Sequence, residues 1–163
     1  MSPKNNPTRR ALIGLAAVAG VAGLGALPHL LAAAPRTQVT VWKTPNCGCC
    51  KEWVTHLQSN GFEVVTHDVK ETASKRQALG IPVKYGSCHT GTVNGYALEG
   101  HVPAKDIQRL LRDKPTAVGL AVPGMPVGSP GMEMSGATDA YDVMLVLKDG
   151  SASVFQSYAA KAA

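Results

Sequence analysis

The 163-residue sequence has few aromatic residues and no stretch in which they alternate with basic side chains. Aromatic residues make up 5% of the chain, and the formal net charge of +5 depends on Lys4, Arg9 and Arg10 near the N-terminus. From Pro35 onward, 13 basic against 11 acidic residues leave a charge of only +2. Domains that bind nucleic acids carry a basic patch or stripe, so we expect no nucleic-acid partner. The sequence also lacks internal repeats, and its length fits one domain with appendages.

Charged residues are also absent from residues 11–34, which are mostly Ala, Gly, Leu and Val. Basic residues before this stretch and the small residues Ala32-Ala33-Ala34 at its end are typical of an export signal, which we place at residues 1–34. The run Thr8-Arg9-Arg10-Ala11-Leu12-Ile13 resembles a twin-arginine signal. A retained N-terminal membrane anchor stays open, because the uncharged stretch exceeds the ~20 residues that span a bilayer. Either way, the rest of the chain is expected in the periplasm or an equivalent compartment.

Alternation, helical spacing and turn residues predict the elements of a domain at residues 35–163. Strands are expected at residues 38–43, 62–67, 85–90 and 92–98, with Thr90-Gly91 as the turn between the last two. Helices are expected at residues 49–60, 72–79 and 104–112. The order is β-α-β-α-β-β-α, with a cysteine motif where the first strand leads into the first helix. It predicts an α/β fold with a thioredoxin-like core.

The region that follows the last of these helices has a different composition. Residues 119–136 hold five glycines, three prolines and three methionines. We expect this segment to be a loop without regular structure, and long loops of this kind are commonly functional or disordered. Residues 141–158 are expected to form a C-terminal β-hairpin that turns at Lys148-Asp149-Gly150.

The distribution of the four cysteines does not fit a framework of structural disulfides. Three lie in the motif Cys47-Gly48-Cys49-Cys50 and the fourth is Cys88; adjacent cysteines such as Cys49 and Cys50 meet disulfide geometry only with strain. A helix N-terminus offers free N–H groups and a partial positive charge that stabilise thiolates. Cys47 and Cys50 also have the spacing of thiol–disulfide exchange, and we expect a disulfide between them when no metal is bound.

Closely spaced thiolates are soft ligands, and thiolate and thioether ligands together select copper(I). A third thiol beside a redox pair invites disulfide scrambling, so the three cysteines are better explained as metal ligands. We expect a site for several copper ions, because bridging sulfurs let several soft ions share few residues. The methionines of the loop strengthen this interpretation, because zinc prefers thiolate with imidazole. The candidate ligands beyond the four cysteines are Met125, Met132, Met134, His89 and His101.

Longer motifs resemble the CopG-type copper-resistance proteins, a family whose members are often described only as a metal-binding domain. The resemblance covers residues 39–158 and includes Cys47-Gly48-Cys49-Cys50-x-x-Trp53, Ser87-Cys88-His89-Thr90, Glu99-Gly100-His101-Val102-Pro103 and Pro123-Gly124-Met125-Pro126. It implies a periplasmic protein with a thioredoxin-like core that contributes to copper tolerance. It also implies a copper cluster bridged by Cys47, Cys49, Cys50 and Cys88, with histidine and methionine supplements.

Two alternatives stay open. A thiol–disulfide oxidoreductase is compatible with the predicted fold and with the Cys47/Cys50 spacing, and four cysteines also suit zinc or an iron–sulfur cluster. We assign no catalytic residue and expect binding rather than enzymatic turnover, although thiolates can supply electrons to copper(II). The expected partners are copper ions and other periplasmic copper-handling proteins, and the membrane only if the N-terminal segment is retained.

Overall fold

The computed structural model describes residues 36–134 and 136–162, which belong to one compact unit at Ala34–Ala163. The predicted export signal at residues 1–34 lies outside the described residues, and so does the alternative of a retained anchor. None of the helices within the described part combines the length and apolar character that crossing a bilayer requires.

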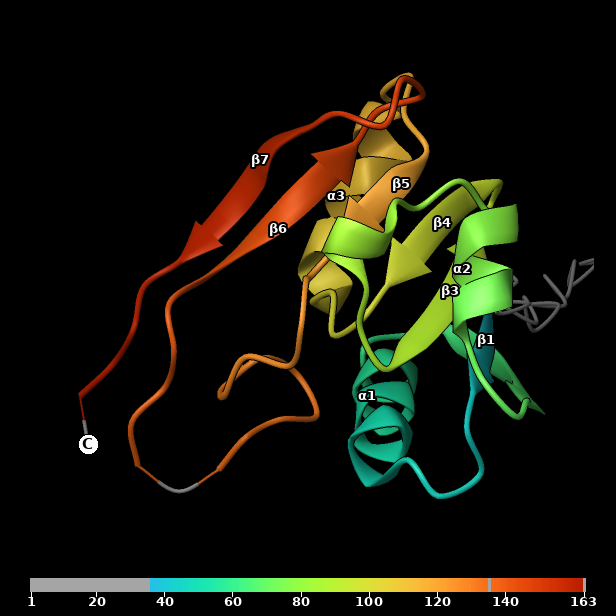
Figure 1. The fold of residues 1–163 in the computed structure, drawn as a ribbon. Helices are drawn as coiled ribbons and strands as arrows, with labels where there is room; N and C mark the ends of the chain where they lie inside the picture. Colours follow the sequence, from blue (N-terminus) through green and yellow to red (C-terminus); the bar gives the residue numbers. More distant parts are fainter. Residues whose placement is uncertain (1–35, 135, 163) are drawn as a thin grey trace, which may run out of the picture. The chain divides into compact units, whose positions relative to one another are not determined.

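The described residues form a mixed α/β fold with one seven-stranded sheet and three α-helices (Figure 1). The strand order across the sheet is β2-β1-β3-β4-β5-β6-β7. The strands are β1 (Gln38–Lys43), β2 (Glu63–Asp68), β3 (His89–Val93), β4 (Tyr96–Glu99), β5 (Gly119–Ala121), β6 (Tyr141–Val146) and β7 (Ala152–Tyr158). The helices are α1 (Gly48–Ser59), α2 (Ala73–Ala78) and α3 (Ala104–Asp113), with a short 3₁₀ turn, η1, at Val83–Tyr85.

The first four strands follow the predicted element order. Strand β1 pairs in parallel with β2 on one side and antiparallel with β3 on the other, and β3 continues into β4 as an antiparallel hairpin. The prediction that Thr90-Gly91 forms the hairpin turn is wrong, because both residues pair within β3. The turn is Asn94-Gly95, with φ of 44° and 85°, and Asn-Gly is the dipeptide that tolerates positive φ at both central positions of a tight hairpin.

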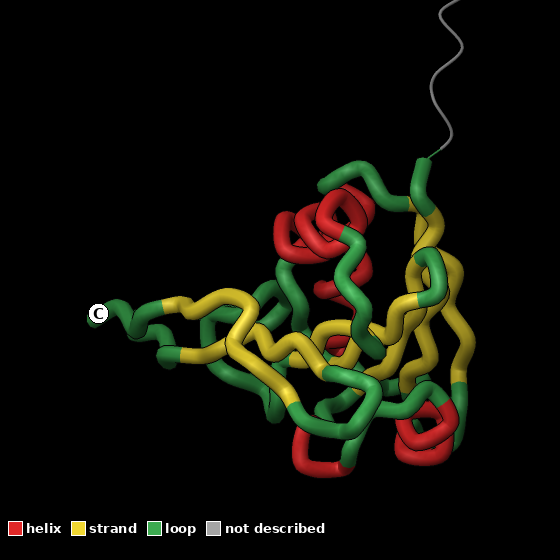
Figure 2. The backbone as a smooth tube through the Cα atoms, turned by 90° about the horizontal axis from the view of Figure 1, so that it is seen from above, coloured by secondary structure: helices red, strands yellow, loops and turns green. Residues whose placement is uncertain are grey.

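The main hydrophobic core lies between the sheet and helices α1 and α3. Apolar residues of α1 and α3 recur at helical spacing, so each helix presents one buried face to the strands. Figure 2 shows helical segments on both sides of the strands. Each fully buried aliphatic or aromatic side chain contributes roughly 1.5–3 kcal/mol through burial. Fully buried members of this core include Val39, Val41, Trp53, Leu57, Ile107, Leu110 and Leu120.

The prediction that residues 119–136 contain no regular structure is wrong for the first three of them. Residues 119–121 form β5, which pairs in parallel with β4 and antiparallel with β6. Gly119 permits this pairing, because a Cβ atom there would overlap the carbonyl oxygen of Ala97. A glycine-rich composition conceals this strand, since its glycine serves close backbone approach rather than a turn.

The C-terminal hairpin, β6–β7, extends the sheet beyond β5 and packs against α3. The rings of Tyr141 and Tyr158 are stacked at 4.7 Å between centroids. The Tyr158 hydroxyl donates a hydrogen bond to Asp106 Oδ2 at 2.5 Å, and the Arg109 guanidinium lies 3.7 Å from the centre of the Phe155 ring. The hairpin is therefore attached to the start of α3, the helix that follows His101 in the chain.

His56 links α1 to the first turn of α3, and its titration should affect folding stability. Its Nε2 accepts a hydrogen bond from the backbone N–H of Ala104 at 3.1 Å, an N–H that α3 itself leaves without a partner. Burial lowers the pKa of His56 below its usual value of 6.5. The folded state therefore binds fewer protons than the unfolded state near pH 6, so the contribution of His56 is complete above about pH 6.5 and declines as the pH falls toward the folded pKa.

We expect His56→Ala to lose about 1 kcal/mol of unfolding free energy at pH 7.5, the usual cost of a lost helix cap. The loss should shrink as the pH is lowered to 5, because the wild-type contribution itself disappears. Urea unfolding followed by circular dichroism at several pH values measures both effects. His67→Ala on β2, whose imidazole is exposed, serves as the control; equal pH dependence in both variants would contradict the capping role.

Candidate metal centre

The cysteine motif lies at the start of α1, directly after the loop that ends β1. Cys47 is the N-cap residue of the helix, and its Sγ accepts a hydrogen bond from the backbone N–H of Cys50 at 3.3 Å. Cys47 and Cys50 are joined by a disulfide, with 5.3 Å between their Cα atoms. The pairing predicted for the metal-free protein is therefore present, and Cys49 and Cys88 remain free thiols.

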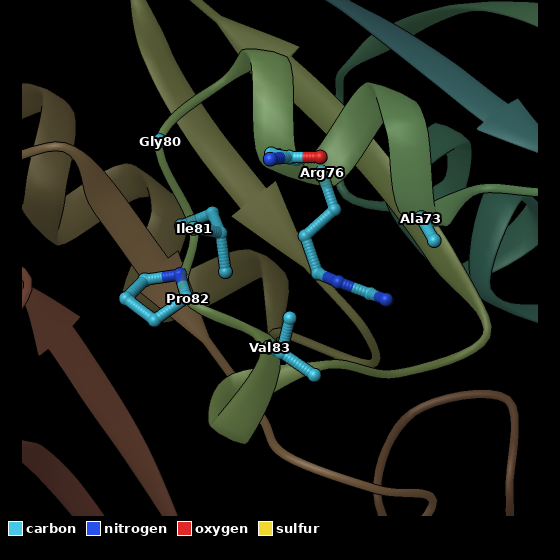
Figure 3. A pocket seen from close by; sticks show the side chains of 7 residues that line it. Ala73, Arg76, Gly80, Ile81, Pro82 and Val83 are labelled. Carbon is cyan, nitrogen blue, oxygen red and sulfur yellow. The ribbon is translucent and has the colours of Figure 1, made fainter.

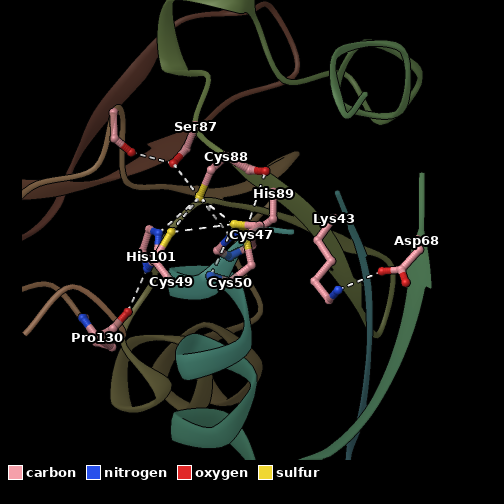
Figure 4. Close-up of a disulfide and its surroundings, with 11 residues drawn as sticks. Lys43, Cys47, Cys49, Cys50, Asp68, Ser87, Cys88, His89, His101 and Pro130 are labelled. Atoms are coloured by element: carbon pink, nitrogen blue, oxygen red, sulfur yellow. Dashed lines mark hydrogen bonds and ion pairs between the residues drawn. A yellow bond between two sulfur atoms is a disulfide. The ribbon is translucent and has the colours of Figure 1, made fainter. Parts of the chain in front are cut away.

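Cys88 brings the fourth sulfur to the same place from a distant part of the chain. It immediately precedes β3 (His89–Val93), so it adjoins a central strand without being part of it. Its Sγ lies 3.6 Å from Cys50 Sγ and 3.9 Å from Cys49 Sγ, while Cys49 Sγ lies 3.6 Å from Cys47 Sγ. All four sulfurs lie within 4.8 Å of one another (Figure 4). We call these four residues the sulfur cluster.

His101 is oriented with one ring nitrogen toward the sulfur cluster. Its Nδ1 lies 2.8 Å from the carbonyl oxygen of Pro130, and because a carbonyl only accepts hydrogen bonds, Nδ1 carries the proton. In the neutral ring Nε2 is then an unprotonated acceptor, 3.1 Å from Cys88 Sγ. A second ring nitrogen fixed by a backbone carbonyl is the usual arrangement of a metal-ligating histidine.

His89 lies against the same sulfur and, like His101, is inaccessible to solvent. Its Nδ1 is 3.3 Å from Cys88 Sγ, its ring packs at 4.3 Å against Trp53, and its side chain is fully buried. The buried Nε2 has no hydrogen-bond partner. Cys88, His89 and His101 each offer a ligand atom within 4.8 Å of the others, so the structure brings both predicted histidines to the cluster.

Burial favours the neutral forms of Cys88 and of both histidines. Burial, together with the neighbouring Cys49, raises the pKa of the Cys88 thiol to about 12. Burial lowers the pKa of His89 to about 3, with the nearby His101 acting in the same direction, and burial also lowers the pKa of His101. The stabilisation of thiolates expected at the start of α1 does not lower the pKa of Cys88, although its Sγ lies beside Cys49 and Cys50, because burial outweighs it. A metal ion that binds this sulfur must displace a proton.

The loop between β5 and β6 that carries Met125, Met132 and Met134, here called the methionine loop, contacts the cluster through its backbone. Besides the Pro130 carbonyl on His101, Gly131 lies so close to α1 that a Cβ atom there would be 2.7 Å from both the Cys49 oxygen and the Trp53 nitrogen. The three predicted thioether ligands are less enclosed: Met125 and Met134 are 52% and 64% exposed, and Met132 is half-buried.

Two charged residues that the sequence analysis did not name as candidate site residues bind the backbone next to Cys88. The carboxylate of Glu99, on β4, is fully buried and pairs with Arg76 of α2 at 3.1 Å. Burial raises the pKa of Glu99, while its hydrogen bonds to Thr90, Ser87 and Arg76 oppose that shift. The sequence offered one indication that Glu99 is buried and functional: it is a single acidic residue at the end of the apolar run Tyr96-Ala97-Leu98.

A surface hollow lies beside Arg76 and is distinct from the cluster. It has a volume of about 430 Å³, and its lining contains no cysteine or histidine. Figure 3 shows the Arg76 side chain between α2 and the turn at Pro82 and Val83. The candidate chemistry therefore belongs to the sulfur cluster, in which Cys50 is buried and the other three cysteines are half-buried, rather than to this hollow.

The fold and the site define a mixed α/β domain with a potential soft-metal centre of four sulfurs and two imidazoles. Two solved structures named "Copper resistance protein copG", Form 1 and Form 2, are each 48% identical to the chain with a TM-score of 0.73. The matches cover 77% and 76% of this chain, respectively, and 99% of each solved chain. The chain belongs to the CopG family of copper resistance proteins.

A family model also matches part of the chain. The family model described as "Protein of unknown function, DUF411" matches residues 85–132, a range that contains Cys88, both histidines of the centre and two of the loop methionines. No curated protein sequence matches the chain. Membership in the CopG family therefore depends on the two solved relatives. The family model is consistent with this membership.

Proposed function

We propose that this protein is exported to the periplasm and contributes to copper resistance by holding copper(I) in a thiolate cluster. The observation that carries the proposal is the convergence of four cysteine sulfurs within 4.8 Å of one another. The names of its solved relatives point to copper rather than to another soft metal. The proposed periplasmic location depends on the interpretation of residues 1–34 as an export signal.

The donor set matches the preferences of copper(I). Thiolates and thioethers select this ion, and imidazole nitrogen suits copper as well. With sulfurs 3.6–3.9 Å apart, one sulfur can serve two ions, so several ions can share four cysteines. Cys47 and Cys50 become ligands only after an external dithiol reduces their disulfide to two thiols, transferring two electrons and two protons and becoming a disulfide itself. Metal binding then releases the thiol protons.

A thioredoxin-like core is the second part of the proposal. It is supported by the order β2-β1-β3-β4, with β1 and β2 parallel and joined through α1, and with β3 and β4 antiparallel. It is also supported by the position of the cysteine motif where β1 leads into α1. Strands β5, β6 and β7 are additions at the β4 edge, and the loop between β5 and β6 carries the three methionines.

Competition between disulfide and metal tests the proposed function. We expect the anaerobically reduced protein to bind copper(I) and the oxidised protein to bind almost none, because a disulfide removes two of the four thiolates. Copper loading should also protect the thiols from oxidation. Metal analysis with thiol titration on the same samples measures both effects; equal loading of the two forms would refute the cluster.

A thiol–disulfide oxidoreductase is the second candidate, and the Cys47–Cys50 disulfide at the start of α1 favours it. Such an enzyme would turn over disulfide substrates without metal and would be inhibited by copper. Turnover that survives both Cys49→Ser and Cys88→Ser, but not the loss of Cys47 or Cys50, would identify this activity. We expect negligible turnover in the metal-free protein.

The methionine loop should affect retention of copper more than folding. Replacing Met125, Met132 and Met134 together with leucine keeps their apolar bulk and removes the thioethers. We expect weaker retention of copper(I) against a competing chelator, with little change in thermal stability, because Met125 and Met134 are largely exposed. Met144→Leu on β6 is the matched control. If the triple variant retains copper as well as Met144→Leu does, the loop methionines are not ligands.

A further inference from the structure

The position of Cys88 determines whether the sulfur cluster exists. Its Sγ contacts Cys49, Cys50, His89 and His101, more partners than any other sulfur of the cluster has. Yet Cys88 belongs to neither a helix nor a strand. Because Cys88 lies outside regular secondary structure, its backbone is held by hydrogen bonds that other parts of the chain make to the residues beside it.

Glu99 supplies these bonds on both sides of Cys88. Its Oε1 accepts from the backbone N–H of Ser87 at 2.7 Å, and its Oε2 accepts from the Thr90 hydroxyl at 2.7 Å. Arg76 donates to Glu99 Oε1 at 3.1 Å and to the Ser87 carbonyl oxygen at 3.4 Å. The carboxylate and the guanidinium together hold the residue before Cys88 through both its N–H and its C=O groups.

The packing around this pair leaves little freedom for the segment. A Cβ atom at Gly86 would lie 2.9 Å from Arg76 Nη1, and one at Gly100 would lie 2.6 Å from Ser87 Oγ. The Ser87 hydroxyl also donates to the carbonyl oxygen of Gly124 in the methionine loop. Backbone, ion pair and loop thus meet at Ser87, the residue before Cys88.

Stability alone does not account for an acidic residue here. Thr90 and Glu99 are paired across β3 and β4, and an apolar pair at such a buried position is often as stable as a buried ion pair or more stable. A buried carboxylate is retained at low cost only where several donors compensate it. At Glu99, two of the three donors belong to residues within two positions of Cys88.

We propose that Glu99, braced by Arg76, is the positioning residue that places Cys88 Sγ in the sulfur cluster. The part of this inference that concerns copper depends on the proposed function, whereas the placement of Cys88 does not. The described hydrogen bonds of the Glu99 carboxylate go to Arg76, Ser87 and Thr90, and none goes to a cysteine sulfur. Glu99 acts through the backbone of Ser87 and the side chain of Thr90.

The test measures the reactivity of Cys88 in the full chain, metal-free and with the Cys47–Cys50 disulfide intact. Iodoacetamide labelling followed by peptide mass spectrometry gives separate rates for Cys88 and Cys49. Thr90→Val removes one bond to Glu99 without changing any charge. Thr92→Val makes the same substitution two residues further along β3, where the hydroxyl makes no described hydrogen bond, and serves as the matched control.

We expect Glu99→Ala to speed labelling of Cys88 by about tenfold or more and Thr90→Val by several-fold, because each loses hydrogen bonds to a charged group. Thr92→Val should match the wild type. Glu99→Gln should restore slow labelling, since its amide oxygen still accepts from Ser87 and its NH₂ group can donate to Thr90.

Copper(I) stoichiometry and the thiolate-to-copper absorption of the same variants provide the second readout. We expect Glu99→Ala to bind fewer ions with an altered spectrum and Glu99→Gln to resemble the wild type. If the wild type binds no copper, the proposed function fails while the labelling rates still test Glu99. If labelling of Cys88 is unchanged in Thr90→Val and in a folded Glu99→Ala, the positioning role is wrong. Should Glu99→Ala fail to fold, Thr90→Val decides.

Discussion

Cys49→Ser should abolish most copper(I) binding while leaving the Cys47–Cys50 pair intact. Cys49 Sγ lies between Cys47 Sγ at 3.6 Å and Cys88 Sγ at 3.9 Å, so it connects the helix start to the distant cysteine. A serine hydroxyl is a hard, weak donor for a soft ion. Even the loss of an outer partner of a metal ligand typically costs 10–100-fold in affinity, so we expect more than about a hundredfold loss here.

The control for this variant lies on the same helical turn. Lys51→Ser introduces the same side chain at an exposed position two residues further along α1, and it should retain wild-type loading. Metal analysis of anaerobically reduced protein and competition with a copper(I) chelator measure the difference. Full loading of Cys49→Ser would contradict the cluster and would strengthen the oxidoreductase alternative.

Gly131→Ala should detach the methionine loop from the metal centre. Gly131 has a φ of +85°, and an added Cβ atom would lie 2.7 Å from backbone atoms of Cys49 and Trp53. The start of α1 cannot yield easily because Trp53 is fully buried in the core, so the loop must move. Such overpacking typically costs 1–3 kcal/mol. Displacing Pro130 would also remove the carbonyl that orients His101.

The expected result is a lower thermal midpoint together with weaker copper(I) retention and a changed thiolate-to-copper absorption. Gly124→Ala is the matched control, because Gly124 also has a positive φ, +69°, in the same loop but has no atom within 4 Å of an added Cβ. Both variants pay the backbone cost of positive φ, and only Gly131→Ala adds the clash. Equal copper retention in the two variants would show that loop contact with α1 does not support the centre.

The local elements were predictable because each depends on a short stretch of sequence. Alternation at residues 38–43 and helical spacing after Cys49 reflect the periods of strand and helix, and the structure has β1 and α1 within one residue of the expected bounds. The turn at Asn94-Gly95 was equally readable, and the error there came from placing the turn four residues early. Gly119 was different, since its role depends on how closely β5 approaches Ala97 on β4.

The sequence by itself determined the chemistry of this protein: four thiols, three of them crowded at a helix start, with a methionine-rich loop and two histidines within reach. The tertiary structure decided which of these groups meet. Cys88 reaches Cys50 across 38 residues only because β3 pairs beside β1, and His101 is oriented by Pro130 from a loop 29 residues away. The raised pKa of Cys88 and the bracing of its backbone by Glu99 and Arg76 likewise arise from burial and long-range contact. Sequence periodicity records local backbone preferences, whereas contacts across the sheet depend on the order in which distant strands pair.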